Sequence, residues 1–152
     1  MIPGETEDAY RLRIEAQTRR NWEAVRLQQE AAQRAREDEL WRTAGRVVVA
    51  EVQSVSDTRK DRRGAEYRLV TLRLIAAGRG PGGASRLQLR TYDGGDACIG
   101  PQGPIYPTQG RLVLFGRKGK LSDATVLGWT DAFLTTHPET LALLARASAA
   151  SQ

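Results

Sequence analysis

The chain changes character at Ala44 and Gly45, and this change constrains the fold more than any other feature. Residues 5–44 contain neither glycine nor proline and are rich in Glu, Arg, Gln and Ala, which favour helix. From Gly45 onward, short runs of Val, Leu and Ile alternate with glycine-rich turns, a pattern typical of strands. The sequence therefore predicts a long charged amphipathic helix over 5–44, joined without a linker to a strand-rich body.

Four parts follow from this pattern. Residues 1–4 are expected as a disordered or processed end, and 148–152 as a frayed tail. Between them lie the helix at 5–44 and a body at 45–147, which is long enough to bury a core without metals or disulfides. The first residues lack the basic and apolar regions of a signal peptide, and they are compatible with an end left after its removal. The expected location is periplasmic or secreted if a signal peptide was removed, and otherwise cytoplasmic; whether Met1 is native stays open.

The body contains five predicted strands, over 45–56, 66–77, 86–92, 111–117 and 125–130. Within the second, Val70, Leu72 and Leu74 alternate with polar residues, as in a half-buried strand. The stretches 57–64 and 78–83 are expected as turns, and 94–110 as a long loop.

A short helix is predicted to follow Pro138, with Thr135 or Thr136 as its N-cap. Five short strands, a long connection before the fourth, and a terminal helix predict a mainly β fold with helices. The expected architecture is a five-stranded OB-like Greek-key barrel, preceded by the long N-terminal α-helix and followed by the short C-terminal helix. A meander or a small sandwich is the alternative.

Several segments of the body form a recognisable series. They are 45–52 (GRVVVAEV), 67–74 (YRLVTLRL), 87–91 (LQLRT) running into 94–98 (GGDAC), 110–115 (GRLVLF), Leu121 and the C-terminal helix. With these segments, residues 45–144 resemble the netrin-like (NTR) domain group, in a bacterial-type form; the group includes the tissue inhibitors of metalloproteinases. The resemblance implies an OB-like barrel and a secreted or envelope location.

Two departures limit what this resemblance implies. The group often has a second cysteine near the position of 124–129, and this chain has none there. The metalloproteinase inhibitors also use an N-terminal cysteine that reaches the catalytic zinc, and here a charged helix stands at that end. Metalloproteinase inhibition is therefore not implied. Because Cys98 is the single cysteine, no intrachain disulfide can form, and whether it is free or bridges to another chain stays open.

No catalytic or metal-binding pattern stands out in the sequence. The single histidine, His137, precedes Pro138 and is expected to cap a helix or to lie on the surface. One His and one Cys cannot supply the common four-ligand zinc sites. Asp93 and Asp96 flank two glycines, as turn residues often do. We therefore expect a protein that is not an enzyme, with no metal and no cofactor.

The leading interpretation is a noncatalytic binding or assembly module, in which the barrel is a platform and the long helix a docking arm. The apolar positions of this helix recur at spacings of 3, 4 and 7 and define one narrow seam. A protein partner or a second copy would contact this helix, whereas the alternative is a helix packed on its own body through Leu40, Trp41 and Ala44. The candidate interface residues are Tyr10, Ile14, Trp22, Val25 and Trp41.

Single-stranded nucleic acid is the alternative ligand. Residues 45–152 carry 15 basic and 9 acidic residues, a net charge of +6, although this charge is also ordinary for a soluble domain. OB barrels bind strands of nucleic acid on the face of their second and third strands and on the first hairpin loop. In this chain those places hold Arg59, Lys60, Arg62, Arg63, Tyr67, Arg73, Arg86, Arg90 and Tyr92. No stretch approaches the roughly 18–20 apolar residues of a membrane span, so none is expected.

Overall fold

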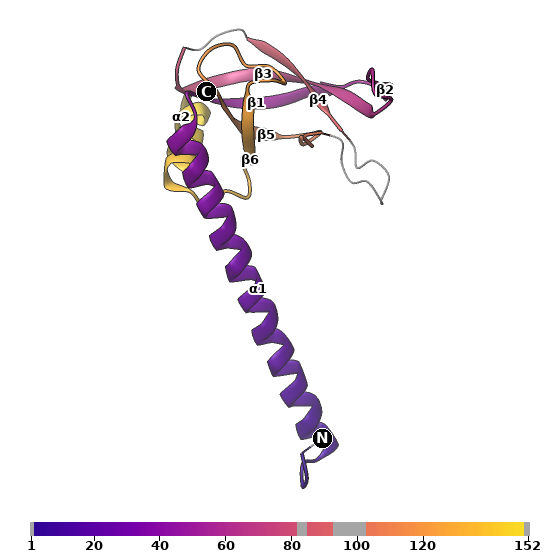
Figure 1. Cartoon of the computed structure of the whole chain (residues 1–152). Coiled ribbons are helices and arrows are strands. Elements are labelled where there is room, and N and C mark those ends of the chain that lie inside the picture. The colour runs from indigo at the N-terminus through magenta and orange to yellow at the C-terminus, as the bar shows by residue number, and fades with distance from the viewer. Residues whose placement is uncertain (1, 82–84, 93–102, 151–152) are drawn as a thin grey trace. The chain divides into compact units, whose positions relative to one another are not determined.

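The structure is a computed structural model that describes residues 2–81, 85–92 and 103–150 (Figure 1). The chain divides into two compact units, Met1–Arg36 and Glu37–Gln152. Helix α1 (Glu7–Thr43) begins in the first unit, and its last turns belong to the second. The hydroxyl of Thr6 accepts a hydrogen bond from the N–H of Ala9 at 3.1 Å, so Thr6 is the N-cap that starts the helix.

The second unit is a curled antiparallel sheet with helical cover (Figure 1). In this sheet β1 pairs with β3 and β5, β3 also pairs with β2 and β4, and β5 pairs with β6. The order β5-β1-β3-β4 is that of a Greek key, because the fourth long strand returns to lie beside the first. The elements are β1 (Arg46–Val55), β2 (Arg59–Lys60), β3 (Glu66–Arg79), β4 (Arg86–Thr91), β5 (Arg111–Gly116), β6 (Val126–Asp131) and α2 (Pro138–Ala150).

The expected fold class is confirmed as mainly β, with a long N-terminal helix and a short C-terminal one, and the sheet is a half-barrel. Within the described residues β4 and β6 do not pair with each other. Residues 103–106 contact both strands instead. The N–H of Tyr106 donates to the hydroxyl of Thr91 on β4 at 2.9 Å, and the indole N–H of Trp129 on β6 donates to the carbonyl of Ile105 at 2.8 Å.

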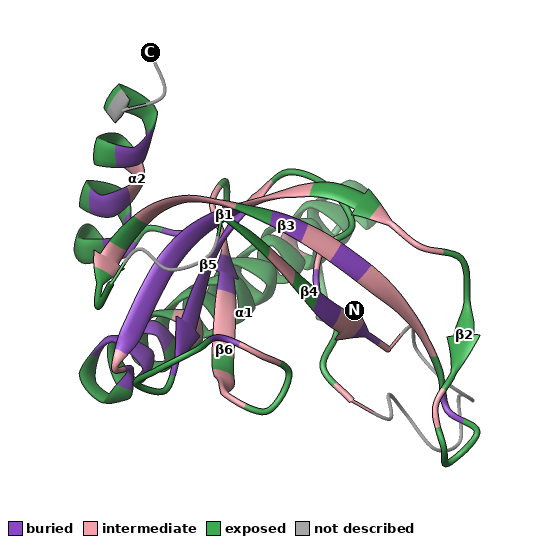
Figure 2. Ribbon diagram, turned by 90° about the horizontal axis from the view of Figure 1, so that it is seen from above, coloured by how far each residue is buried: buried purple, intermediate pink, exposed green. Residues whose placement is uncertain are grey.

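Both faces of the sheet are buried where β1 and β5 cross the body, as the purple ribbons of Figure 2 show. The face toward the helices packs around Leu40, Trp41, Ala44, Val47, Val49, Val113, Phe115, Leu143 and Ala147. The face inside the curl packs around Val48, Ala50, Val70, Leu72, Leu89, Tyr106, Leu112, Leu114 and Leu121. The side chains of β1 and β5 thus alternate between two cores, which explains why these strands are almost continuously apolar.

The elements depart from expectation at three places. Strand β2 lies inside the predicted turn at 57–64, and its two charged residues carry no strand pattern. Strand β3 continues to Arg79, which still pairs with Val47 of β1. Gly78 lies within this strand because a side chain there would come within 2.7 Å of Leu143 on α2. Helix α2 continues to Ala150, so residues 148–150 are helical rather than a frayed tail.

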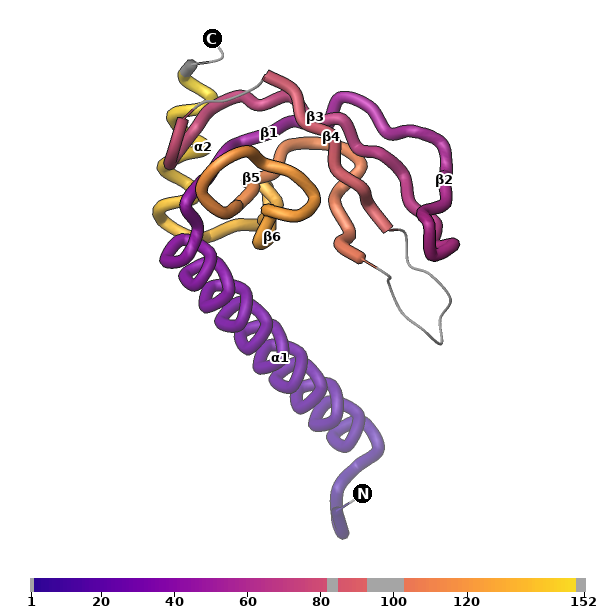
Figure 3. The backbone as a smooth tube through the Cα atoms, turned by 45° about the horizontal axis from the view of Figure 1, so that its top comes forward, coloured from indigo at the N-terminus to yellow at the C-terminus, as the bar shows by residue number. Residues whose placement is uncertain are grey.

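Three further points complete the description. Strand β2 and helix α2 lie at opposite ends of β3, as Figure 3 shows. In the described part of the chain, no helix combines the length and apolar character needed to cross a bilayer. Asp93, Asp96 and Cys98 lie outside the described residues.

Candidate functional site

A basic hollow of about 490 Å³ lies where the β2 hairpin meets the start of β3 and the end of β4. It is open and almost entirely charged, unlike the mostly apolar pockets that enclose small molecules. Four basic residues and one acidic residue line it together with one tyrosine. The lining residues are Lys60, Asp61, Arg62, Arg63, Tyr67 and Arg90.

Asp61 organises this hairpin. One of its carboxylate oxygens accepts hydrogen bonds from the N–H groups of Arg63 and Ala65, at 2.8 and 3.0 Å. Gly64 follows the turn with a φ of 81°, a conformation that suits glycine. Partial burial would raise the pKa of Asp61, but these N–H groups and the Tyr92 hydroxyl outweigh it and hold that pKa below its usual value. The carboxylate is therefore committed to holding the loop.

Two of the lining residues, Tyr67 and Arg90, belong to an aromatic and cationic stack. The rings of Tyr67 and Tyr92 lie 5.8 Å apart, and the guanidinium carbon of Arg90 lies 4.4 Å from the centre of the Tyr67 ring. A hydrogen bond with Tyr92 raises the pKa of Arg90, so this cation persists across the usual pH range. Arg90 and Tyr67 hold each other in place by a cation–π contact.

The other cations of the hollow lack counter-ions. Lys60, Arg62 and Arg63 are exposed, and no other described residue forms an ion pair with them. By contrast, Arg59 pairs with Asp57 at 3.6 Å. An exposed cation without a partner remains available to an anionic ligand.

A second hollow of about 500 Å³ lies farther along the same two strands, with Gln88 on β4 opposite Thr71 on β3. Of the predicted basic residues Arg86 lines it, while Arg73 forms an ion pair with Glu51 at 3.3 Å instead. The lining residues are Thr71, Arg86, Leu87, Gln88, Lys120, Leu121, Ser122 and Asp123.

The loop between β5 and β6 lines the second hollow and contacts Arg90, which lines the first. A carboxylate oxygen of Asp123 accepts a hydrogen bond from the backbone N–H of Arg90 at 2.8 Å, so the loop is tethered to β4 between them. Lys120 enters the site through this loop, and the sequence analysis missed it. The run RKGK at 117–120, a basic turn between two strands, was the signal that could have found it.

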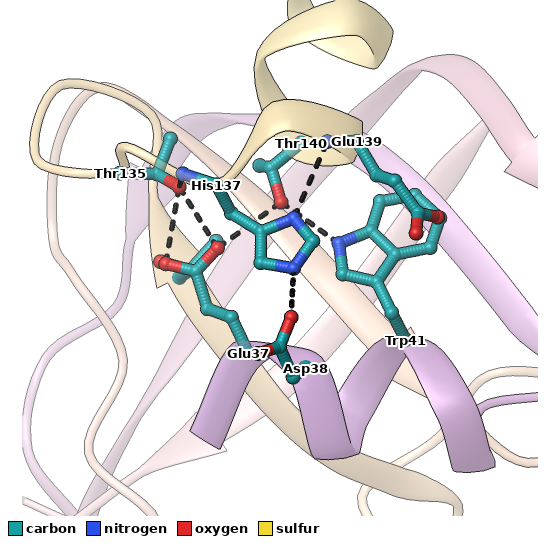
Figure 4. A network of polar contacts seen from close by, with 8 residues as sticks. Glu37, Asp38, Trp41, Thr135, His137, Glu139 and Thr140 are labelled. Carbon is teal, nitrogen blue, oxygen red and sulfur yellow. Dashed lines mark hydrogen bonds and ion pairs between the residues drawn. The ribbon is translucent and has the colours of Figure 1, made fainter. Parts of the chain in front are cut away.

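A buried polar network lies at the helical end of the body (Figure 4). The carboxylate of Glu37 is 1% exposed and accepts hydrogen bonds from the hydroxyls of Thr130, Thr135 and Thr140, with contacts between 2.8 and 3.1 Å. The indole N–H of Trp41 donates to Thr140 at 2.8 Å. Because that N–H can only donate, the Thr140 hydroxyl must direct its own hydrogen to Glu37. The network therefore satisfies a buried carboxylate and fixes the end of α1.

His137 joins the same network as the N-cap of α2, so the expectation of a capping histidine is confirmed and that of a Thr135 or Thr136 cap is wrong. Its Nδ1 accepts from the N–H of Glu139 at 3.3 Å, and its Nε2 donates to Asp38 at 2.5 Å. Thr135 is instead committed to Glu37. All these partners are internal, which marks the network as structural.

The candidate residues of α1 divide between the two units. Trp41 is 7% exposed and packs against Phe115 with ring centres 5.4 Å apart, as expected for the alternative in which this end of the helix packs on its own body. The sequence left both contacts open for Trp41 because it does not show where the free part of the helix ends. The other four are exposed, with exposed fractions of 36% for Tyr10, 39% for Ile14, 70% for Trp22 and 42% for Val25.

Comparison with known proteins gives no match among protein-family models, curated proteins or solved structures. The resemblance to the netrin-like group therefore stays a prediction. Across residues 2–81, 85–92 and 103–150, no group of three or more His, Cys, Asp or Glu side chains is placed to hold a metal ion.

Proposed function

We propose that the protein is a noncatalytic binding module whose β3–β4 face binds single-stranded nucleic acid. The observation that carries the proposal is the basic hollow. There Lys60, Arg62 and Arg63 form no ion pair with any described residue, and they lie beside the stacked pair Tyr67 and Arg90. Cations that follow phosphates and an aromatic ring that stacks with bases are the two ingredients of such sites.

The shape of the face supports an extended ligand. The two hollows of about 490 and 500 Å³ lie along β4, one beside the β2 hairpin and one beside the loop at 117–125. Each is lined by basic residues, Arg86 and Lys120 in the second, where Thr71 and Gln88 also lie. A small enclosed ligand would need an apolar pocket, whereas a single strand of nucleic acid fits an open, charged track.

Fluorescence anisotropy with a labelled oligothymidylate of roughly 15–20 nucleotides tests this proposal, since an OB fold that binds single strands covers about 4–16 nucleotides. The full chain is expected to bind at about 50 mM salt and to weaken as salt rises, because phosphate contacts release counter-ions. The double variant Arg62→Ala/Arg63→Ala is expected to lose roughly tenfold or more in affinity and to reduce the salt dependence.

The matched control is Arg19→Ala/Arg26→Ala, which removes the same charge from exposed positions of α1. Its affinity for the oligonucleotide should equal that of the unaltered chain. No binding by the unaltered chain at low salt would refute the proposal. Equal losses in both double variants would show attraction by overall charge instead of a site.

A second function, protein association through α1, has its own observation. Trp22 is 70% exposed in the structure, and tryptophan is enriched among residues that dominate protein interfaces. Its neighbour Val25, one turn on, is also exposed. The partner on this face is a second copy or another protein, and sedimentation of the full chain distinguishes the two.

A further inference from the structure

One face of α1 carries no charge between Tyr10 and Ala35. Its positions are separated alternately by four and three residues, the spacing that brings side chains to the contact line between two packed helices. All of them are exposed. We call this line the neutral seam; it consists of Tyr10, Ile14, Gln17, Asn21, Ala24, Gln28, Ala31 and Ala35.

The residues of the neutral seam suit close contact with another helix. Ala24, Ala31 and Ala35 are small enough to let a second backbone approach, and Asn21 sits where a polar residue can fix the register of two helices. At 1.5 Å per residue the seam is about 38 Å long. Its apolar content is modest, so the charges beside it have a large share in selecting the partner.

The positions that flank the neutral seam are basic and include no acid. The basic ones are Arg11, Arg13, Arg20 and Arg34, and the remaining flanking positions are uncharged. The middle of the helix also carries three acids, Glu15, Glu23 and Glu30. None of them occupies a seam position or a flanking position, so they lie on the side of the helix away from the seam.

Half of these flanking cations are already neutralised. Arg11 contacts Asp8 at 3.4 Å, and Arg13 contacts Glu5 at 3.0 Å. Arg20 and Arg34 are exposed and form no ion pair with any other residue that the structure describes. They are therefore the two cations of this face that remain open to a partner.

We propose that the neutral seam binds an α-helix of a different protein that carries Glu or Asp at the positions flanking its own seam. A second copy of this chain would bring arginines and uncharged residues, with no flanking acid, in either a parallel or an antiparallel arrangement. Charge complementarity thus favours an acidic helical partner over self-association. The neutral seam is a different face of α1 from the one that carries Trp22, because Trp22 follows Glu15 by seven residues and lies away from the seam. The inference rests on a docking role of α1, as proposed above, and is independent of nucleic-acid binding.

A synthetic helical peptide of roughly 28 residues, with Ala and Leu in the seam and Glu at the flanking positions, is the probe. Its binding to the full chain is measured by anisotropy of a label on the peptide. The acidic peptide is expected to bind, and Arg20→Glu/Arg34→Glu is expected to weaken that binding by about tenfold or more, because like charges then face each other. A peptide of the same design with Lys at the flanking positions should bind the unaltered chain weakly and this variant better.

The matched control is Arg19→Glu/Arg26→Glu, which makes the same charge change on the side opposite the seam and should leave peptide binding unchanged. An acidic peptide of the same composition in scrambled order should not bind. Tighter binding of the Lys peptide than of the Glu peptide to the unaltered chain would overturn the acidic partner but keep a docking helix. Binding of neither peptide would overturn both the proposal and the docking role of this face of α1. Sedimentation as a dimer that the Arg20→Glu/Arg34→Glu variant preserves would overturn the acidic partner but keep a docking role for α1.

Discussion

The two ends of the sheet handle charge in opposite ways. At the helical end, the buried carboxylate of Glu37 is surrounded by three threonine hydroxyls, and its partners are fixed in turn by Trp41 and His137. At the other end, Lys60, Arg62 and Arg63 are exposed, and none of the residues that the structure describes forms an ion pair with them. A charge with every partner inside the protein serves the fold, because unpaired burial would be costly. A cluster of like charges without partners costs stability and is better explained by a ligand outside.

The largest change in unfolding free energy is expected for a substitution of Glu37, at the helical end of the sheet. In Glu37→Gln the new amide donates where the hydroxyls of Thr130, Thr135 and Thr140 also donate, so at least one hydroxyl loses its acceptor. We expect unfolding free energy to fall by about 2–3 kcal/mol in urea denaturation, with oligonucleotide binding unchanged.

Glu39 provides the control two residues on, because it is exposed and pairs only with Arg42 in the same helix. Glu39→Gln should change the unfolding free energy by less than about 0.5 kcal/mol. If Glu37→Gln were equally mild, the buried network would contribute little and the contrast between the two ends would disappear.

Much of this fold can be read from the sequence. The alternation of Val70, Leu72 and Leu74 locates β3, and the unbroken helix formers before Gly45 locate α1. These signals are local, since each depends on residues within one element. By contrast, the acceptor role of Glu37 depends on hydroxyls 93–103 residues away in the chain. A glutamate among many in a charged helix gives no sign of burial.

The candidate site was partly predictable for the same reason. Lys60, Arg62, Arg63, Tyr67 and Arg90 line one hollow, and they follow from the strand positions once a barrel is assumed. Sequence could not separate these open cations from others that ion pairs neutralise. The pairing of Arg73 with Glu51 bridges β3 and β1, which only the strand register reveals.

An effect at most as large, and confined to alkaline pH, is expected at Tyr106, which is buried inside the curl and belongs to neither end. Burial, with a smaller contribution from Asp123, raises the pKa of Tyr106 to about 12. The unfolded chain ionises near pH 10 and releases a proton that the folded chain keeps until about pH 12. Stability present below pH 10 is therefore lost as pH rises toward 12, by up to about 2–3 kcal/mol.

The measurement is urea denaturation at intervals from pH 9 to pH 12, repeated on Tyr106→Phe. The variant keeps the ring and lacks the ionisable group, so its stability should fall less steeply over this range. Identical curves for the two proteins would assign the alkaline loss to other groups and would show that the Tyr106 hydroxyl reaches solvent.

Substitutions in the basic hollow are expected to change the unfolding free energy least. The same substitutions are expected to lower the affinity for the oligonucleotide most. Arg62→Ala/Arg63→Ala removes two exposed cations that no carboxylate of the described residues engages, so the unfolding free energy should change by less than about 0.5 kcal/mol. Relief of repulsion from Lys60 could make that change slightly stabilising. A loss as large as that of Glu37→Gln would mean that the arginines hold the hairpin together, and the two ends of the sheet would then both be structural. Unchanged stability with lost oligonucleotide binding is the combination that only a binding surface produces.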